Sequence, residues 1–291
     1  MNNASLTVGN SETEAGRSNL PVTVICRSRR WEFPDFTELF SNQDLLLFLV
    51  VRNIKVRYRQ TLLGGAWAIV QPLATMVMLT LVFGRLIGVP SEGVPYWIFS
   101  LSGLVLWLFF SQTVSGVSAS LVTNSQLIEK AYFPRLALPT AATLAGLVDF
   151  SISFVMLVLV LAVAGPGLSP TILLCPLIAL LAALVVLGIG SALAALTVRF
   201  RDVTYVIPFA MQLWLFATPV VYPLSIVPEK WRFALALNPA TGLVEAFRWA
   251  ALGTSVNPWP YFAVSCASGL ILLLGALLLF RHMEHSFADV I

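Results

Sequence analysis

Residues 171–197 read TILLCPLIALLAALVVLGIGSALAALT, an apolar run without a charged side chain. At 1.5 Å per residue, a helix of this length exceeds the roughly 30 Å hydrocarbon core of a bilayer. Hydrophobic residues make up 58% of the chain and charged residues only 11%, whereas soluble domains carry about 25% charged residues. The sequence therefore predicts an all-α polytopic membrane protein with six transmembrane helices, because five similar runs lie at 66–88, 96–120, 141–164, 205–222 and 258–280.

The Lys and Arg residues are unevenly distributed between the two sides of these runs. With a cytosolic N-terminus, only Arg85, Lys230, Arg232 and Arg248 fall on outer segments. Cytosolic loops of membrane proteins carry an excess of Lys and Arg, so both termini are predicted to be cytosolic, with residues 1–36 as a polar N-terminal extension. The other thirteen then lie inside: Arg17, Arg27, Arg29, Arg30, Arg52, Lys55, Arg57, Arg59, Lys130, Arg135, Arg199, Arg201 and Arg281.

Residues 37–63 precede the first span and predict an amphipathic interface helix. Arg52, Lys55 and Arg59 recur at i, i+3 and i+7, which places them on one face of a helix. Such a helix suits the membrane plane, where its cations contact phosphates at the inner leaflet and its apolar side contacts acyl chains. The alternative is a cytosolic helix beside the membrane that anchors nothing in particular. The apolar side is supplied by Leu45, Leu46, Phe48, Leu49 and Val50.

The loop at 121–139, between the second and third runs, is too long for a tight turn and too charged for hydrocarbon. We expect a soluble partner to dock on it, so we call it the coupling loop. Its candidate contact residues are Glu129, Lys130, Tyr132, Phe133, Pro134 and Arg135.

Residues 224–252, between the fifth and sixth runs, are moderately apolar and broken by prolines. Two short helices at about 229–237 and 240–252 are expected, neither long enough to span, with a turn at Asn238. Helices at membrane depth that do not span are tolerated where protein covers them, so we interpret them as re-entrant outer gate helices between the fifth and sixth spans. Glu245 and Arg248 stand at i, i+3 and can pair.

Ionisable groups that could carry chemistry are scarce. The chain has no phosphate-binding loop and no Gly-Lys dipeptide, so it is predicted not to be an enzyme and to have no nucleotide site of its own. Only two histidines occur, both after residue 280, and no metal site or nucleic-acid partner is predicted. Asp149 is the lone carboxylate inside a span, either a functional group or one that bonds neighbouring helices.

Aromatic side chains in two runs suggest a route for carbohydrate, because sugar rings stack on aromatic faces and a conduit must bind weakly. Aromatic belts at the membrane interfaces explain residues near span ends equally well. The candidates are Trp107 and Phe110 in the second run, and Trp214, Phe216 and Tyr222 in the fifth.

Several short stretches in this order resemble the permease subunits of ABC-2-type exporters of cell-surface polysaccharides, the Wzm-like and TagG-like permeases. The resemblance spans about 50–291 and leaves the first forty or so residues unexplained. The matching stretches are 55–60 (KVRYRQ), 71–72 (QP), 130–135 (KAYFPR), 201–203 (RDV), 218–223 (TPVVYP), 238–239 (NP), 247–248 (FR) and 287–291 (FADVI).

The resemblance implies a homodimer in the bacterial inner membrane, paired with two copies of an ABC ATPase that holds ATP and Mg²⁺. It also implies a cytosolic coupling helix, outer gate helices and export of a lipid-linked polysaccharide such as lipopolysaccharide O-antigen, with membrane lipids as further contacts. Two alternatives stay open: an ABC-2 exporter of a small drug or lipid, and an integral-membrane lipid-sugar enzyme. The enzyme would need clustered acidic or histidine residues near one interface, which the sequence lacks.

Overall fold

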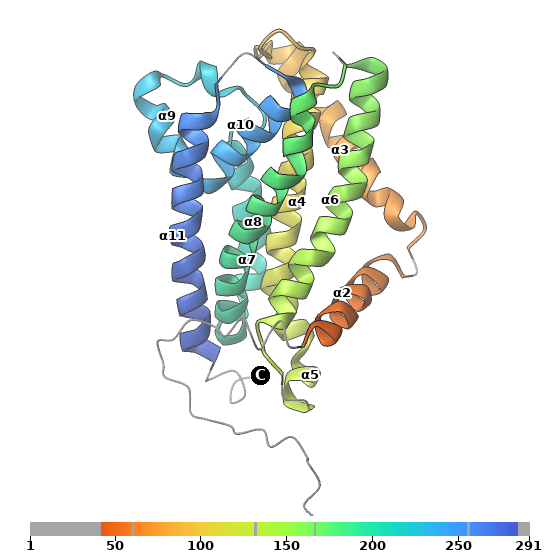
Figure 1. Cartoon of the computed structure of the whole chain (residues 1–291), viewed down its shortest axis with the longest axis vertical. Coiled ribbons are helices and arrows are strands. Elements are labelled where there is room, and N and C mark those ends of the chain that lie inside the picture. Colours follow the sequence, from red (N-terminus) through yellow and green to blue (C-terminus); the bar gives the residue numbers. More distant parts are fainter. Residues whose placement is uncertain (1–41, 60, 131–132, 166, 255–256, 285–291) are drawn as a thin grey trace, which may run out of the picture. The chain divides into compact units, whose positions relative to one another are not determined.

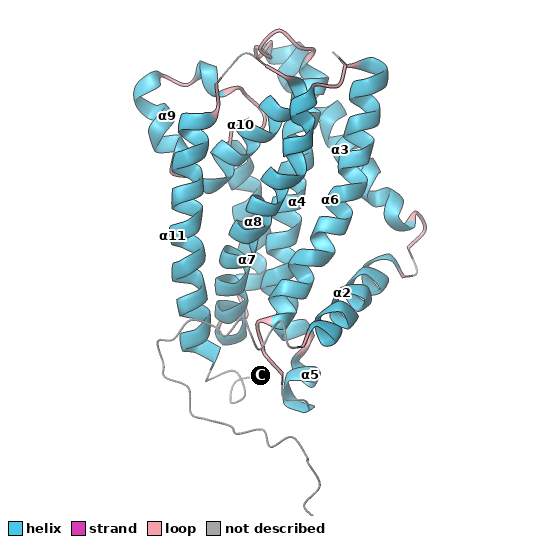
Figure 2. Cartoon of the chain, in the orientation of Figure 1, coloured by secondary structure: helices cyan, strands magenta, loops and turns pink. Residues whose placement is uncertain are grey.

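The computed structural model describes residues 42–59, 61–130, 133–165, 167–254 and 257–284. The chain divides into two units, 1–30 and Trp31–Ile291. Since the described ranges begin at residue 42, the predicted N-terminal extension at 1–36 lies outside them. The described residues all belong to the second unit. Every regular element in the described ranges is a helix, with no strand (Figure 2).

Five helices of the described part are long and apolar enough to cross a bilayer, and they match five of the six predicted runs. Figure 1 shows α4, α6, α7 and α11 running lengthwise through the bundle. The five candidate spans are Gly64–Ile87, Tyr96–Thr123 (α4), Ala137–Ala164 (α6), Pro170–Arg199 and Trp259–Glu284 (α11). The first combines a short 3₁₀ turn, α3 (Trp67–Leu79) and a wider π-helical stretch, Thr80–Ile87; the fourth combines a 3₁₀ turn and α7 (Cys175–Arg199).

The helix in the fifth predicted run is shorter than expected. It is α8 (Val203–Phe216), whose 14 residues extend about 21 Å, less than the hydrocarbon thickness. The predicted helix over 205–222 is therefore wrong at its outer end. Residues 217–223 form an irregular turn because Pro219 lacks an N–H and disfavours helical geometry in the residue before it.

Helix α4 forms the centre of the bundle. In the most apolar 18-residue stretch of α4, 78% of the residues are buried, against 11% in the corresponding stretch of the span that contains α3. It packs against α3, α6 and α7, and Phe99 and Leu104 are wholly inaccessible in its core-facing surface. In the single chain, by contrast, only Pro72 and Leu79 of α3 and only Ile207 and Met211 of α8 are buried.

Glycines allow α11 to approach its neighbours closely. A Cβ on Gly188 of α7 would lie 2.7 Å from the Cα of Leu273 in α11, and a Cβ on Gly242 would lie 2.6 Å from the Tyr261 carbonyl oxygen. Because backbone atoms cannot move aside as a side chain can, only glycine fits here, as is usual at contacts between membrane helices.

Two short helices follow α8, close to the residues the sequence predicts: α9 (Glu229–Ala236) and α10 (Pro239–Leu252). The side chain of Asn238 accepts a hydrogen bond from the Ala240 N–H, and Pro239 occupies the first helical position, both typical of a helix start. Gly253 ends α10 in the left-handed conformation, φ 64°. Every residue of α10 except Trp249 is buried.

The opposite end of the bundle carries α2 (Gln43–Tyr58) and α5 (Ser125–Lys130), and we call it the α5 end (Figure 1). The ends of α4, α6, α7 and α11 meet there in a second apolar cluster that includes Leu49, Ile128 and Phe280. Of the predicted interface helix at 37–63, residues 37–41 and 60 lie outside the described ranges. Helix α2 is apolar on two sides, because Leu49 is buried in the cluster while Leu47 and Phe48 are each 64% exposed.

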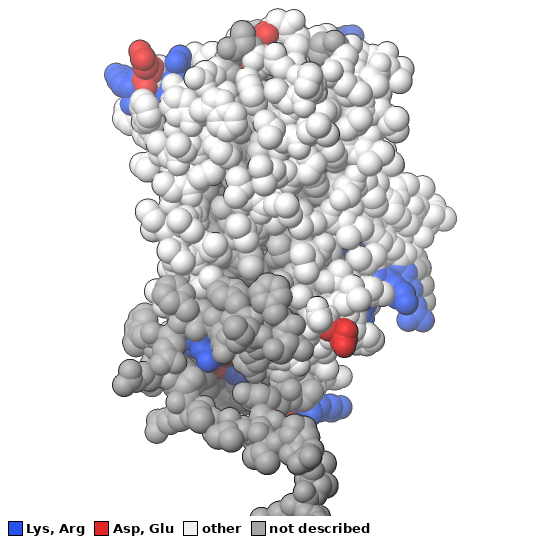
Figure 3. Space-filling model, viewed as in Figure 1, with Lys and Arg blue, Asp and Glu red and all other residues white. Residues whose placement is uncertain are grey.

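Charged side chains gather at the two ends of the face drawn in Figure 3, with an uncharged band between them. The α5 end carries the cations of α2 and α5, and the other end, the α9 end, carries those of α9. This arrangement is typical of a protein whose middle lies in hydrocarbon.

Candidate functional sites

Helix α5 forms the middle of the predicted coupling loop and presents charge to solvent. Glu129 and Lys130 are exposed, while Ile128 is 9% exposed and packs in the apolar cluster of the α5 end. This short helix is therefore anchored by Ile128 and by the partly buried Leu127, and it presents two opposite charges to a partner.

The rest of the coupling loop is turned toward the bundle. Phe133 packs against the cluster of the α5 end, and Arg135 donates to the main-chain oxygen of Glu284 at the end of α11. Pro134 is half-buried, and Tyr132 lies outside the described residues. Phe133 is half-buried against the bundle, and its contact with a partner stays a prediction.

Asp149, the lone carboxylate of the third predicted span, ties α2 to α6. Its carboxylate pairs with the Arg57 guanidinium and accepts a hydrogen bond from the Tyr58 hydroxyl. This bears out the interpretation that Asp149 bonds a neighbouring helix. Sequence reasoning singled out Asp149 but missed both partners, although an Arg-Tyr pair in the last turn of a helix beside a membrane carboxylate is a usable signal.

Exchanging Asp149 for asparagine is expected to loosen α2. The amide removes the ion pair but keeps the shape, and hydrogen bonds to charged groups contribute about 1.5–3 kcal/mol. Trypsin cleaves within α2 only after local opening, so cleavage after Arg52 and Lys55 should become roughly tenfold faster, which corresponds to about 1.4 kcal/mol. Cleavage after exposed Lys230 on α9 serves as the internal control, and equal acceleration there would indicate global destabilisation.

The three cations predicted to contact inner-leaflet phosphate do not act as one stripe. Lys55 and Arg59 are exposed, whereas Arg52 is half-buried and donates to the side-chain oxygen of Asn124, where α4 ends. The Asn124 amide in turn donates to the Ser120 main-chain oxygen at 2.6 Å. A cavity of about 550 Å³ lies beside this chain of bonds.

The aromatic residues of the predicted carbohydrate route separate into two groups. Trp107 and Phe110 are 3% and 2% exposed, and their rings stack on each other and pack edge-on against Trp214. Side chains buried within one chain do not line a surface, so these two are core residues rather than part of a route. Phe216 is exposed, and Tyr222 is half-buried with its hydroxyl donating to the Phe216 carbonyl oxygen at 3.2 Å.

Glutamines form a polar feature on the outside of the bundle. Gln112 of α4 donates to the side-chain oxygen of Gln71 in α3 at 2.8 Å, and both are exposed. Gln212 is likewise exposed on α8. Amides within membrane-spanning helices usually bond across helix contacts rather than face lipid, so the faces of α3, α4 and α8 that carry them suit a protein contact or an aqueous path.

At the α9 end, Arg248 is buried and contacts several groups, although its Nε has no hydrogen-bond partner among the described residues. Its guanidinium lies 3.0 Å from Glu245, donates to the carbonyl oxygens of Pro219 (2.8 Å) and Val220 (3.2 Å), and stands 3.9 Å from the centre of the Phe99 ring. The predicted pairing of Glu245 with Arg248 is confirmed. Burial raises the pKa of the Glu245 carboxyl, and the Arg248 charge opposes that rise. The pair fixes the turn after α8 to α10 and α4.

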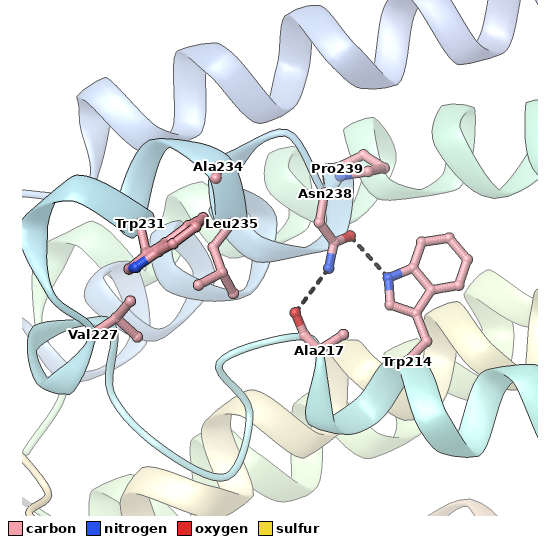
Figure 4. A pocket seen from close by; sticks show the side chains of 8 residues that line it. All are labelled: Trp214, Ala217, Val227, Trp231, Ala234, Leu235, Asn238 and Pro239. Carbon is pink, nitrogen blue, oxygen red and sulfur yellow. Dashed lines mark hydrogen bonds between the residues drawn. The ribbon is translucent and has the colours of Figure 1, made fainter.

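A groove of about 710 Å³ lies between the end of α8 and α9 (Figure 4). Asn238 joins its walls, accepting from the Trp214 indole N–H at 2.9 Å and donating to the Ala217 carbonyl oxygen at 3.2 Å. The same amide also donates to the Thr218 hydroxyl. Since both ends of the Asn238 amide are engaged, the groove offers mainly apolar contact, and Asn238 acts as a joint between α8 and α10.

The ABC-2 type transporter family matches residues 44–252. An O-antigen export system permease protein, RfbA, from Myxococcus xanthus is 32% identical over 259 residues, covering 87% of this chain and 98% of that protein. RfbA from Klebsiella pneumoniae is 26% identical over 250 residues (85% and 95%), and the polysialic acid transport protein KpsM from Escherichia coli is 25% identical over 248 residues (82% and 93%).

Proposed function

Because the chain belongs to the ABC-2 type transporter family, we propose that it is the transmembrane subunit of an ATP-driven exporter of a lipid-linked cell-surface polysaccharide such as O-antigen. The relatives named as O-antigen and polysialic acid transport proteins support this substrate class, since they align along nearly their whole length. The chain contains no Gly-Lys dipeptide, so ATP and Mg²⁺ are assigned to a separate ATPase subunit.

The observation that carries the proposal is the exposed Gln71–Gln112 pair within the membrane-spanning part. A second copy of the chain would cover the open faces of α3 and α8 and enclose these amides between the copies. A sugar polymer presents many hydroxyl groups, which amide side chains bind and release readily. In the proposed assembly two copies of the chain pair with two ATPase subunits. The polymer passes between the copies along Gln71, Gln112 and the exposed ring of Phe216.

In this assembly α8 and the turn after it act as the fifth of six spans and α11 is the sixth. Helices α9 and α10 between them are outer gate helices that re-enter the membrane from outside. The α5 end faces the cytosol, since most Lys and Arg residues lie on that side. Both termini are then cytosolic as well. The membrane is the bacterial inner membrane. Glu129 and Lys130 on α5 are the contacts offered to the ATPase, and Arg135 joins the coupling loop to the end of α11.

The proposal is tested by deleting the gene and measuring polysaccharide on the cell surface. Surface polymer should disappear while polymer accumulates inside, and the wild-type gene should restore it. A Gln71→Leu/Gln112→Leu variant should be made at normal level yet export less than about a tenth of the polymer, because an apolar wall offers no hydrogen bond to sugar.

The control is Leu272→Gln on the exposed side of α11, which changes membrane-facing polarity away from α3. Unchanged surface polymer in the deletion strain, together with lost resistance to a small drug, would favour the drug exporter instead.

A further inference from the structure

The cavity beside Arg52 lies between α2 and the ends of α4 and α6 and has a volume of about 550 Å³. Its walls combine cationic and polar groups: Arg52, Asn53 and Arg57 from α2, and Ser120, Thr123 and Asn124 from the end of α4. Lys55 of α2 and Arg59, which follows its last residue, are not among the lining residues.

Ser120 provides an independent indication of a ligand. Its residue is 6% exposed, yet its hydroxyl is buried without a hydrogen-bond partner among the described residues. A buried polar group left unpaired costs about 1–3 kcal/mol, and most such groups in folded proteins find a partner. Ser120 is one of the residues that line the cavity, so a bound acceptor that reaches its hydroxyl would supply the missing partner.

The charges around the cavity favour an anion. Arg57 is paired with Asp149, but Arg52 is bonded to the neutral amide of Asn124, and no described carboxylate pairs with it. The walls thus keep one positive charge in excess. A guanidinium with several donors beside hydroxyl and amide groups matches phosphate oxygens, which accept multiple hydrogen bonds.

The surroundings of the opening indicate that the anion belongs to a lipid. Val56 lines the cavity and is 68% exposed, and Leu47 and Phe48 on the same helix are also exposed. A helix with open apolar side chains beside cations is typical of one that lies in the membrane interface. A phosphate group could enter the cavity from there while its hydrocarbon tail stays in the bilayer.

We propose that this cavity binds the phosphate-bearing headgroup of the lipid-linked glycan before export. The inference rests on the proposed function for the identity of the lipid, and on the cavity alone for the phosphate chemistry. It replaces the stripe of Arg52, Lys55 and Arg59 with a site in which Arg52 and Ser120 contact the phosphate and Asn53 and Thr123 line the approach.

The test measures binding of farnesyl diphosphate, a short isoprenoid diphosphate, to the purified transporter complex in phosphatidylcholine nanodiscs by calorimetry. Ser120→Ala should weaken binding about three- to tenfold without lowering the unfolding temperature, because the hydroxyl it removes has no partner in the unliganded chain. Arg52→Gln should weaken binding at least about tenfold. Lys55→Gln is the matched control on the same helix and should bind within about twofold of wild type, since Lys55 lies outside the cavity.

Two further ligands separate the possible sources of phosphate. Inorganic pyrophosphate should bind at least about tenfold more weakly, because it lacks the tail that the interface holds, and nanodiscs containing phosphatidylglycerol should compete only weakly. The proposal is overturned if Ser120→Ala binds like wild type, if Lys55→Gln loses as much affinity as Arg52→Gln, or if farnesol or pyrophosphate binds as tightly as farnesyl diphosphate.

Binding is measured without transport, so this result and the export assay are independent. The purified complex could bind farnesyl diphosphate through Ser120 while deletion of the gene leaves surface polymer unchanged. That result would retain the phosphate site and reject the polysaccharide function. If deletion of the gene removes surface polymer but the Ser120 and Arg52 variants bind like wild type, the polysaccharide function is retained and the phosphate site is rejected.

Discussion

An Arg248→Met variant is expected to lose about 3–5 kcal/mol of stability, the usual cost of removing one partner from a buried ion pair. Methionine fills much of the space but leaves the Glu245 carboxylate buried without a countercharge, and the Pro219 and Val220 carbonyl oxygens lose their donor. The measurement is the fraction of monodisperse protein that remains after heating in detergent. Lys230→Met on the exposed surface of α9 is the control and should stay within about 0.5 kcal/mol of wild type.

Two further comparisons identify the ion pair as the cause. Replacing both partners, Glu245→Leu with Arg248→Met, should recover a large part of the loss, because no isolated charge remains. In Arg248→Met alone, the pKa of Glu245 should rise further, since the cation that opposes the effect of burial is gone. A group with a raised pKa in the folded state stabilises at low pH and loses that contribution as pH rises. The single variant should therefore be less destabilised at pH 5 than at pH 8, and an equal loss at both would contradict this account.

Reversing both charges of α5, Glu129→Lys with Lys130→Glu, is expected to reduce co-purification of the ATPase subunit at least about tenfold. Both side chains are exposed, so folding should be unaffected, whereas like charges placed opposite each other at an interface cost several kcal/mol. The readout is the ratio of ATPase to permease after affinity purification, together with surface polymer.

The control is a second double variant, Lys55→Glu with Arg59→Glu, which reverses two charges at the end of α2 and leaves α5 intact. Equal loss of ATPase in both variants would mean that α2 rather than α5 holds the partner. Phe133→Asp would be a poor substitute, because that ring packs among helix ends and its loss would disturb the fold.

The positions of the apolar runs were enough to find the five candidate spans, because hydrocarbon excludes charge and every span therefore leaves an apolar run. They could not find the end of α8, since residues 217–222 are as apolar as the helix before them. The usable signal was Pro219, whose effect on backbone geometry is local and does not depend on hydropathy. Spacing rules likewise recovered the Glu245–Arg248 pair, whose members lie one helical turn apart.

Contacts between distant parts of the chain were beyond such rules. Nothing in the spacing of the sequence relates Arg248 to the Pro219 carbonyl oxygen, 29 residues away, or Arg57 to Asp149. The position of Phe133 was equally undetermined, because an aromatic residue in a charged loop can either dock a partner or fill a core. The unpartnered hydroxyl of Ser120 is invisible in a sequence, since it is defined by what surrounds it.

The anchoring of α5 has a mechanical consequence. Ile128 on its own helix and Phe133 and Leu136 just after it are all seated in the cluster where α4, α6, α7 and α11 end. A loosely tethered loop would absorb a push by bending, but a close-packed contact is stiff and transmits displacement. With α5 as the docking element we propose, a movement of the partner would displace a short, rigidly packed helix. The displacement would then reach the ends of α4, α6, α7 and α11 together.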